Sequence, residues 1–183
     1  MSESIAITIT YLEMLRRPSG QRPHAPLGFE GAALMLIRAA KPPVHFYRYL
    51  YDAVGRDYNW VDRKRSSDEA LVLDIHDERV EIYVLYVQGV PAGYFELDFR
   101  TNSECDLAYF GLVKDFVGRR LGPFLLGTAV DTAWNHKIER LTVNTNTLDH
   151  TKALPLYQRM GFSPYAQMKS EIQPLLDGEG FGP

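Results

Sequence analysis

Hydrophobic and polar positions alternate along several short segments of the chain, which is the pattern of strands with one buried face. Residues 5–11 set isoleucine and tyrosine against small side chains. Residues 79–87 and 92–99 surround the turn Gln88-Gly89-Val90-Pro91, so together they predict a β-hairpin. Further strands are predicted for the apolar segments 32–39, 106–113 and 138–147.

Other segments repeat apolar residues every three or four positions, as one face of a helix does. They predict helices over 44–54, from Ser66 onward, over 123–135 and over 151–160. Ser66 and Glu69 have the spacing of a capping box. In the first helix the expected inner face consists of Phe46, Tyr49, Leu50 and Val54.

The order strand, helix, strand, helix over residues 106–160 favours parallel pairing through a right-handed crossover. We therefore expect an α/β fold with a mixed central sheet flanked by helices. The length of 183 residues suits a single domain over 1–183. Its first part, 1–29, combines the N-terminal strand with a loop rich in proline.

Composition narrows the classes of function. The net charge of −3 gives no general electrostatic reason to bind nucleic acid or an anionic membrane. Cys105 is the only cysteine, so no intrachain disulfide can form, and no zinc-ligand spacing is present. We expect no metal. The chain starts without a signal-peptide pattern and has no apolar run long enough to span a bilayer, so a cytoplasmic location is expected.

A basic turn rich in glycine lies between the strand at 106–113 and the helix at 123–135. Its sequence is Val117-Gly118-Arg119-Arg120-Leu121-Gly122. The first N–H groups of a helix lack intrahelical partners and carry partial positive charge, so a phosphate can bind there. A solvated surface turn explains the same residues equally well when the turn is taken alone.

The helix over 151–160 places Tyr157 on its inner face. Ala153, Leu156 and Met160 share that face at helical spacing, and Gly161 is the expected stop. Pro155 lies inside the segment, so the helix is expected to begin late or to kink. By itself, Tyr157 reads as a core tyrosine.

Taken in order, these two segments resemble the GNAT superfamily of N-acyltransferases that use acyl-CoA. The turn follows the family's cofactor pattern Gln/Arg-x-x-Gly-x-Gly/Ala, with Val117 in place of the polar residue and Arg120 in place of the first glycine. Residues 153–162 follow the Asn-x-x-Ala-x-x-Leu-Tyr-x-x-x-Gly-Phe signature, with His150 in place of asparagine. The resemblance spans about 30–175.

The resemblance implies a splayed sheet, acetyl-CoA as co-substrate and direct transfer of the acetyl group to an amine in a ternary complex. Tyr157 would protonate the departing thiolate, and a backbone N–H near Leu112 or Val113 would meet the acyl carbonyl. A homodimer is a further possibility. Acyl-CoA would bind along Leu112, Val113, Val117, Gly118, Arg119, Arg120, Leu121, Gly122, Pro123 and His150.

The amine must lose a proton before it attacks, and Glu96 is the first candidate base. It shares one strand face with Tyr94 and Asp98, although that face could equally be solvated. Reserve candidates on the next strand are Glu104, Asp106 and Tyr109. Cys105 as a nucleophile is a competing mechanism, but an inert buried thiol is the better interpretation.

The acceptor is expected to bind over residues 44–65, which in this family cover the substrate cleft. Aromatic walls suit an apolar or cationic amine, whereas Arg63-Lys64-Arg65 could suit an anion. A solvated loop is the preferred interpretation of these three residues. The alternative function is an acyl-CoA sensor without catalysis, and a nucleic-acid-binding role is disfavoured by the charge. The predicted acceptor-binding residues are Tyr47, Tyr51, Tyr58 and Trp60.

Overall fold

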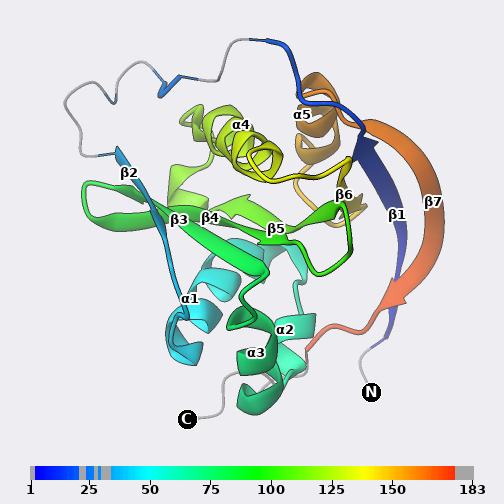
Figure 1. Ribbon diagram of the computed structural model, residues 1–183. Helices are drawn as coiled ribbons and strands as arrows, with labels where there is room; N and C mark the ends of the chain where they lie inside the picture. The colour runs from blue at the N-terminus through cyan, green and yellow to red at the C-terminus, as the bar shows by residue number, and fades with distance from the viewer. Residues whose placement is uncertain (1–2, 21–23, 27–28, 30–33, 176–183) are drawn as a thin grey trace.

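One mixed sheet organises the part of the chain that the computed structural model describes, residues 3–20, 24–26, 29 and 34–175. Its seven strands lie in the order β2-β3-β4-β5-β6-β1-β7. Helices α4 and α5 cover one face, and α1, α2 and α3 cover the other (Figure 1). The expected α/β architecture is confirmed. The strands are β1 (Ile5–Met14), β2 (Leu34–Arg38), β3 (Val80–Val87), β4 (Val90–Asp98), β5 (Glu104–Leu112), β6 (Arg140–Asn146) and β7 (Ser163–Ile172).

The helices follow the predicted order with shifted ends. They are α1 (Val44–Gly55), α2 (Asp62–Arg65), α3 (Asp68–Ile75), α4 (Leu121–Trp134) and α5 (Ala153–Arg159), with short 3-10 turns η1 (Arg56–Tyr58) and η2 (Lys114–Phe116). Pro155 is the third residue of α5. A proline in the first turn costs no intrahelical hydrogen bond, so α5 begins late rather than kinking.

Strands β3 and β4 form the expected hairpin. Gln88 and Gly89 both have positive φ, 52° and 81°, as a two-residue turn of type I′ requires. Strand β4 is central and is buried on both faces. Phe95 and Leu97 pack in the cluster under α4, whereas Tyr94 and Glu96 face α1 and its neighbours. The face that carries Glu96 is therefore not solvated.

The β5-α4-β6 crossover gives the expected parallel pair, but the pairing is short. It joins Glu104 through Asp106 to Arg140 through Thr142, and no later residue of β5 pairs with β6 in the described register. Both strands continue for several residues beyond that point. They therefore part, which is the splay implied by the family resemblance.

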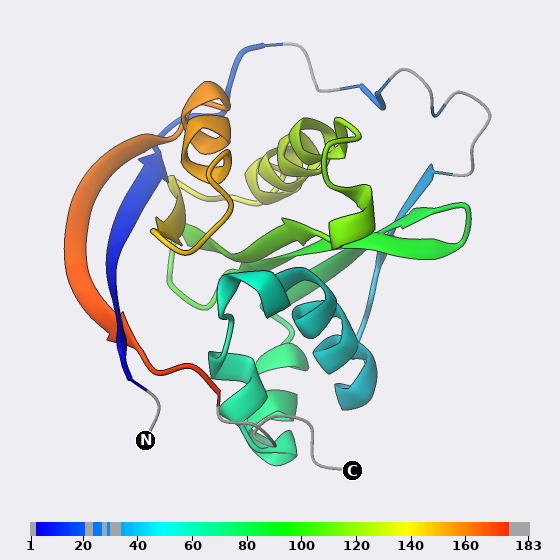
Figure 2. The same ribbon diagram turned by 180° about the vertical axis from the view of Figure 1, so that it is seen from behind.

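Strand β1 lies between β6 and β7 and runs antiparallel to both. Figure 2 shows β1 and β7 curving together along one edge of the sheet. Strand β7 was not predicted from the sequence. Most of its side chains are exposed, so its sequence lacks the apolar alternation that marks a strand with a buried face.

Three local expectations were wrong. The buried face of α1 consists of Tyr47, Leu50, Tyr51 and Val54, while Tyr49 is 48% exposed. Ser67, not Ser66, caps α3, because its Oγ accepts a hydrogen bond from the N–H of Ala70. Residues 62–65 are a helical turn rather than a loop. Of the strand predicted over 32–39, the first two positions lie outside the described residues.

Close packing of β4 against β5 requires glycine at position 93. A Cβ atom there would lie 2.5 Å from the carbonyl oxygen of Gly111 and 2.8 Å from the Leu112 side chain. We predict that Gly93→Ala lowers the free energy of unfolding by about 1–3 kcal/mol, measured by urea denaturation. Gly20→Ala is the control, since a Cβ at that position has no atom within 4 Å. Equal stability of both variants would contradict this.

Candidate active site

A cavity of about 510 Å³ opens where β5 and β6 part. Its walls come from residues 107–112 of β5, from Val143, Asn144 and Asn146 of β6, and from the ends of α1, α4 and α5. This volume lies in the range of small-molecule sites. The parted strands thus leave a space that reaches both helical layers.

One end of the cavity is formed by the turn before α4. Gly118 has φ +84°, and Arg120 adopts the left-handed conformation with φ 62°. Glycine adopts this conformation without strain, which explains why the family pattern places glycine where this chain has Arg120. Within the part of the chain that the structure describes, no side chain caps the start of α4, so its first N–H groups are open to a ligand.

The predicted cofactor residues divide into two groups. Val113 packs with the cluster beside α1, Arg119 stacks over the Phe116 ring at 5.1 Å, and Leu121 is fully buried. None of these three is among the residues that line the cavity. The predicted residues that do line it are Leu112, Val117, Gly118, Arg120, Gly122, Pro123 and His150.

The backbone pattern of β5 distinguishes Leu112 from Val113. The N–H of Val113 donates to the carbonyl oxygen of Ala92 at 2.9 Å, so it is already used in the β4–β5 ladder. Hydrogen-bonded and non-hydrogen-bonded pairs alternate in antiparallel strands, and Leu112 lies opposite Gly93 in the next pair. The N–H of Leu112 therefore points away from β4, toward the parted side of β5.

Tyr157 lies in the wall of the cavity and is 5% exposed. Its ring packs edge-on against Phe110 and Phe162, with centroids 6.1 Å and 5.9 Å away. Burial raises the pKa of its hydroxyl, and the carboxylates of Asp149 and Asp106 raise it further. Tyr157 is therefore a protonated phenol at neutral pH, held in a packed position at the cavity.

The other end of the cavity is aromatic. The rings of Tyr51, Trp60 and Tyr109 form a triangle with centroid distances of 5.1–5.3 Å. Trp60 packs directly on the end of α1, where a Cβ at Gly55 would come within 2.5 Å of its side chain. Tyr58 also lines this end. Of the four predicted acceptor residues, Tyr51, Tyr58 and Trp60 line the cavity, and Tyr47 does not.

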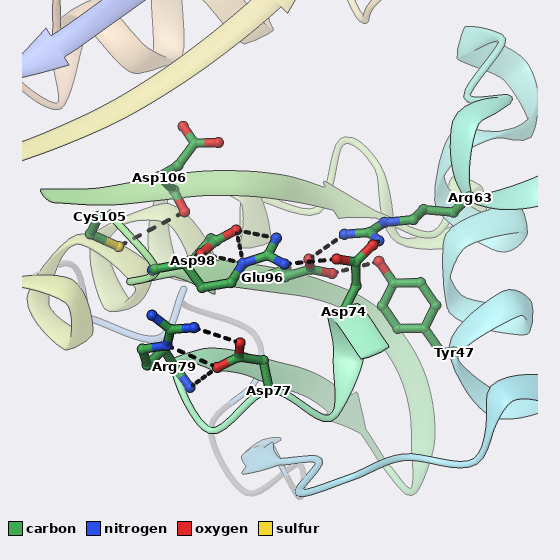
Figure 3. A network of polar contacts seen from close by, with 10 residues as sticks. Tyr47, Arg63, Asp74, Asp77, Arg79, Glu96, Asp98, Cys105 and Asp106 are labelled. Carbon is green, nitrogen blue, oxygen red and sulfur yellow. Dashed lines mark hydrogen bonds and ion pairs between the residues drawn. The ribbon is translucent and has the colours of Figure 1, made fainter. Parts of the chain in front are cut away.

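Tyr47 and Glu96 belong to a buried polar cluster on the α1 side of the sheet (Figure 3). The Tyr47 hydroxyl donates to one oxygen of Glu96, and Arg63 donates to the other at 3.0 Å. Both Tyr47 and Glu96 have no exposed surface. Burial raises the pKa of the Glu96 carboxyl, while the charge of Arg63 and the Tyr47 hydrogen bond lower it. The structure thus separates Glu96 from the cavity lining.

The basic run after Trp60 does not form a solvated loop. Arg63 is 9% exposed and bridges Glu96 to Asp74. Lys64 pairs with Asp52, and Arg65 donates to the carbonyl oxygen of Gln173 at 2.8 Å. None of the three lines the cavity. The preference for a solvated loop was wrong because three acidic residues distant in sequence take up the charges of Arg63 and Lys64.

Comparison with protein families identifies the chain. A model described as "Acetyltransferase (GNAT) family" matches residues 47–162, which is more than half of the sequence. The chain belongs to the GNAT acetyltransferase family. In a search of the curated proteins, none matches it. The matched segment contains the turn before α4, Tyr157 and the aromatic end of the cavity.

Solved structures support the GNAT fold at low sequence identity. A GCN5-related N-acetyltransferase from Kribbella flavida has a TM-score of 0.59 and 13% identity, covering 91% of this chain and 59% of its own. A tandem GNAT protein from the clavulanic acid biosynthesis pathway has a TM-score of 0.57 and 15% identity, covering 95% of this chain and 55% of its own. The chain thus spans little more than half of these proteins. The aminoglycoside N-acetyltransferase AAC(6')-Iy, solved with CoA, has a TM-score of 0.55 and 16% identity, covering 73% of this chain and 90% of its own.

Sequence reasoning missed Asp149 as a residue of this GNAT cavity. Its Oδ2 accepts hydrogen bonds from the Thr145 hydroxyl at 2.7 Å and the Asn146 N–H at 2.9 Å. Its Oδ1 lies 3.4 Å from the indole nitrogen of Trp60. Asp62 lines the cavity too. A polar residue just after a strand is a common signal of a functional site, but nothing in the sequence indicates that Asp149 contacts Trp60.

No helix of the described ranges is long and apolar enough to cross a membrane. No group of three or more histidine, cysteine, aspartate or glutamate residues within those ranges could hold a metal ion.

The buried pair of Arg63 and Glu96 generates a stability prediction. Arg63→Met removes the cation and leaves a carboxylate without exposed surface, so the free energy of unfolding should fall by about 3–5 kcal/mol at neutral pH. The folded state raises the pKa of Glu96, so the loss should shrink as pH falls through that pKa toward the unfolded value of about 4.3. Denaturation across pH measures this.

The double variant Arg63→Met with Glu96→Gln is the control for that prediction. It removes both charges, so most of the lost stability should return, and the difference from the natural protein should no longer grow with pH as it does in Arg63→Met. A single variant as stable as the natural protein, or a loss that grows at acidic pH, would contradict the account of the cluster.

Cys105 generates a reactivity prediction. The thiol is fully buried, and burial raises its pKa. Only the thiolate is nucleophilic, so the native protein should not react with Ellman's reagent on the timescale in which the unfolded chain reacts completely. Rapid labelling of the native protein would instead support the competing mechanism in which Cys105 is the nucleophile.

Proposed function

We propose that the protein is an N-acetyltransferase that moves the acetyl group of acetyl-CoA to a primary amine. The observation that carries the proposal is a single cavity with three features. It begins at an uncapped helix start, passes the phenol of Tyr157 and ends at an aromatic pocket. The helix start suits a donor that carries phosphate, the phenol can protonate a leaving thiolate, and the aromatic pocket can hold the body of the acceptor.

Acetyl-CoA fits the end of the cavity at α4. The first N–H groups of the helix suit the pyrophosphate, and Arg120 lines the same wall. An arginine held in a left-handed conformation is strained by roughly 1–2 kcal/mol. A contact between the Arg120 guanidinium and the pyrophosphate would give that strain a function. A protein of similar fold at 16% identity, solved with CoA, supports the choice of cofactor.

Transfer proceeds by direct attack in a ternary complex. The neutral amine nitrogen bonds to the acetyl carbon, and the N–H of Leu112 stabilises the oxygen that becomes negative. The carbon–sulfur bond then breaks, and Tyr157 gives its proton to the thiolate. The attacking nitrogen must also lose a proton. That proton passes to a carboxylate of the cavity lining, Asp62 or Asp149, because Glu96 lies outside the lining.

The direct test is release of free thiol from acetyl-CoA over a panel of primary amines. We expect release that depends on the amine, with an acetylated amine as the second product. Acetyl-CoA that binds in calorimetry but gives no thiol with any amine would instead favour an acyl-CoA sensor without catalysis. Absence of acetyl-CoA binding at millimolar concentration would reject both functions.

Tyr157→Phe tests the proposed acid. The substitution removes only the hydroxyl, so the packing against Phe110 and Phe162 is kept. We expect kcat to fall on the order of a hundredfold or more, with acetyl-CoA affinity unchanged. Tyr165→Phe is the matched control, because Tyr165 is 48% exposed on β7 and does not line the cavity. An unchanged kcat for Tyr157→Phe at all pH values would reject the role.

A further inference from the structure

The charged groups at the acceptor end of the cavity have one sign. Asp62 and Asp149 line it beside the aromatic triangle of Tyr51, Trp60 and Tyr109. The cationic residues that line the cavity, Arg120, Lys152 and Arg159, belong to the turn before α4 or to the start and end of α5. The acceptor end is therefore electrostatically distinct from the end assigned to the cofactor.

Nearby positive charges are paired with carboxylates or lie outside the cavity lining. The Arg63 guanidinium stacks over Tyr109 at 5.4 Å, but it is paired with Glu96 and Asp74. Arg65 does not line the cavity and donates to the backbone carbonyls of Gln173 and Pro174. Lys114 pairs with Asp57 outside the lining residues. An anionic acceptor would thus meet two carboxylates and no lining cation of the aromatic end.

Asp149 is placed to receive a cation. Its Oδ2 is occupied by Thr145 and Asn146, which fix the carboxylate. Among the described residues, its Oδ1 has only the 3.4 Å contact with the Trp60 indole, so it retains capacity for further donors. Burial raises the pKa of both Tyr157 and Tyr58, and the charge of Asp149 raises each further, so this carboxylate acts on both the proposed acid and the acceptor wall.

The aromatic triangle determines what carries the cation. The three rings pack against one another with centroids 5.1–5.3 Å apart and planes tilted by 51–73°. Tyr51 is almost fully buried, so Trp60 and Tyr109 supply most of the aromatic wall. Ring faces also attract an ammonium group. Tyr58 closes the same end from η1, with its ring 6.3 Å from His150. A flat or apolar body with a terminal ammonium matches both kinds of wall.

We propose that the acceptor is a primary ammonium on a flat, apolar body, with its charged nitrogen held at Oδ1 of Asp149 and its body packed against Trp60, Tyr58 and Tyr109. The inference rests on the proposed function, since it names the acceptor of that same cavity. It selects a cationic acceptor over the anionic one that Arg63-Lys64-Arg65 suggested. Asp149 is thereby a binding and specificity-determining residue.

Binding can be measured without catalysis by leaving out the acetyl donor. The probes are 2-phenylethylamine, its neutral analogue 2-phenylethanol and the anion 3-phenylpropionate, each titrated with and without CoA. The readout is the indole N–H signal of Trp60 in an NMR spectrum. The chain has two tryptophans, and Trp134, whose indole contacts Met14 in the core, provides an internal reference.

The amine should shift the Trp60 signal saturably and leave Trp134 unchanged. We expect its Kd to be about tenfold lower than that of the alcohol, as a charge-assisted hydrogen bond predicts. In Asp149→Asn the ratio of the two constants should fall to about one, since the amide keeps the shape but loses the charge. Asp57→Asn, the same change at a carboxylate outside the lining residues, should keep the natural ratio.

Equal affinities for the amine and the alcohol in the natural protein, or tighter binding of the anion, would overturn the proposal without any variant. An unchanged ratio in folded Asp149→Asn would overturn it as well. The proposed function fails separately. If the amine binds as expected but no amine releases thiol from acetyl-CoA, the binding site stands and the enzyme does not. If amines are acetylated while Asp149→Asn keeps the natural ratio of the two dissociation constants, the protein is an acetyltransferase but Asp149 does not hold the ammonium.

Discussion

The parting of β5 from β6 is the constraint on which the rest of this structure depends. The two strands pair over only three positions, ending at Asp106 and Thr142, whose side chains hydrogen-bond at 2.7 Å. Past that point the facing edges of both strands border the cavity. A paired sheet would fill this space with backbone hydrogen bonds and leave no room for a ligand. The cavity, the free N–H of Leu112 and the position of Tyr157 all follow from the separation.

Each neighbour of the parted strands helps to keep them apart. On one side β5 is bound to β4, with Gly93 allowing the two backbones to approach closely. On the other side β6 is bound to β1, a strand from the start of the chain. The backbone groups on the outer edges of both strands are therefore paired, whereas those that face the gap beyond Asp106 and Thr142 are left to the cavity.

The buried polar cluster supports the site without lining it. Arg63, held by Glu96 and Asp74, lies over the Tyr109 ring at 5.4 Å, and its backbone N–H lies 3.4 Å from the Tyr51 hydroxyl. The cluster thus fixes two of the three rings that form the acceptor wall. Buried ion pairs contribute little net stability but impose a defined arrangement in some proteins. Here that arrangement is the aromatic end of the cavity.

The sequence predicted features that depend on local periodicity and failed for those that depend on distant partners. The hairpin, the crossover helix and the late start of α5 follow from turn residues, apolar spacing and Pro155. Strand β7 was missed because its side chains are mostly exposed. The cavity position of Tyr157 followed from the family signature. Glu96, the predicted base, and Tyr47, a predicted acceptor-binding residue, lie instead in the core outside the cavity lining. Only the fold reveals that Arg63 reaches Glu96, or that Asp149 meets Trp60.

The most direct test of the account is a map of backbone amide NMR shifts on addition of acetyl-CoA. The account predicts that the largest changes fall on Leu112, on the turn from Gly118 to Gly122 and on the start of α5, because these border the space between the parted strands. Changes of the same size on β2, or on the outer edge of β7, with none at the turn would contradict it. In that case the cavity between β5 and β6 would not be the cofactor site.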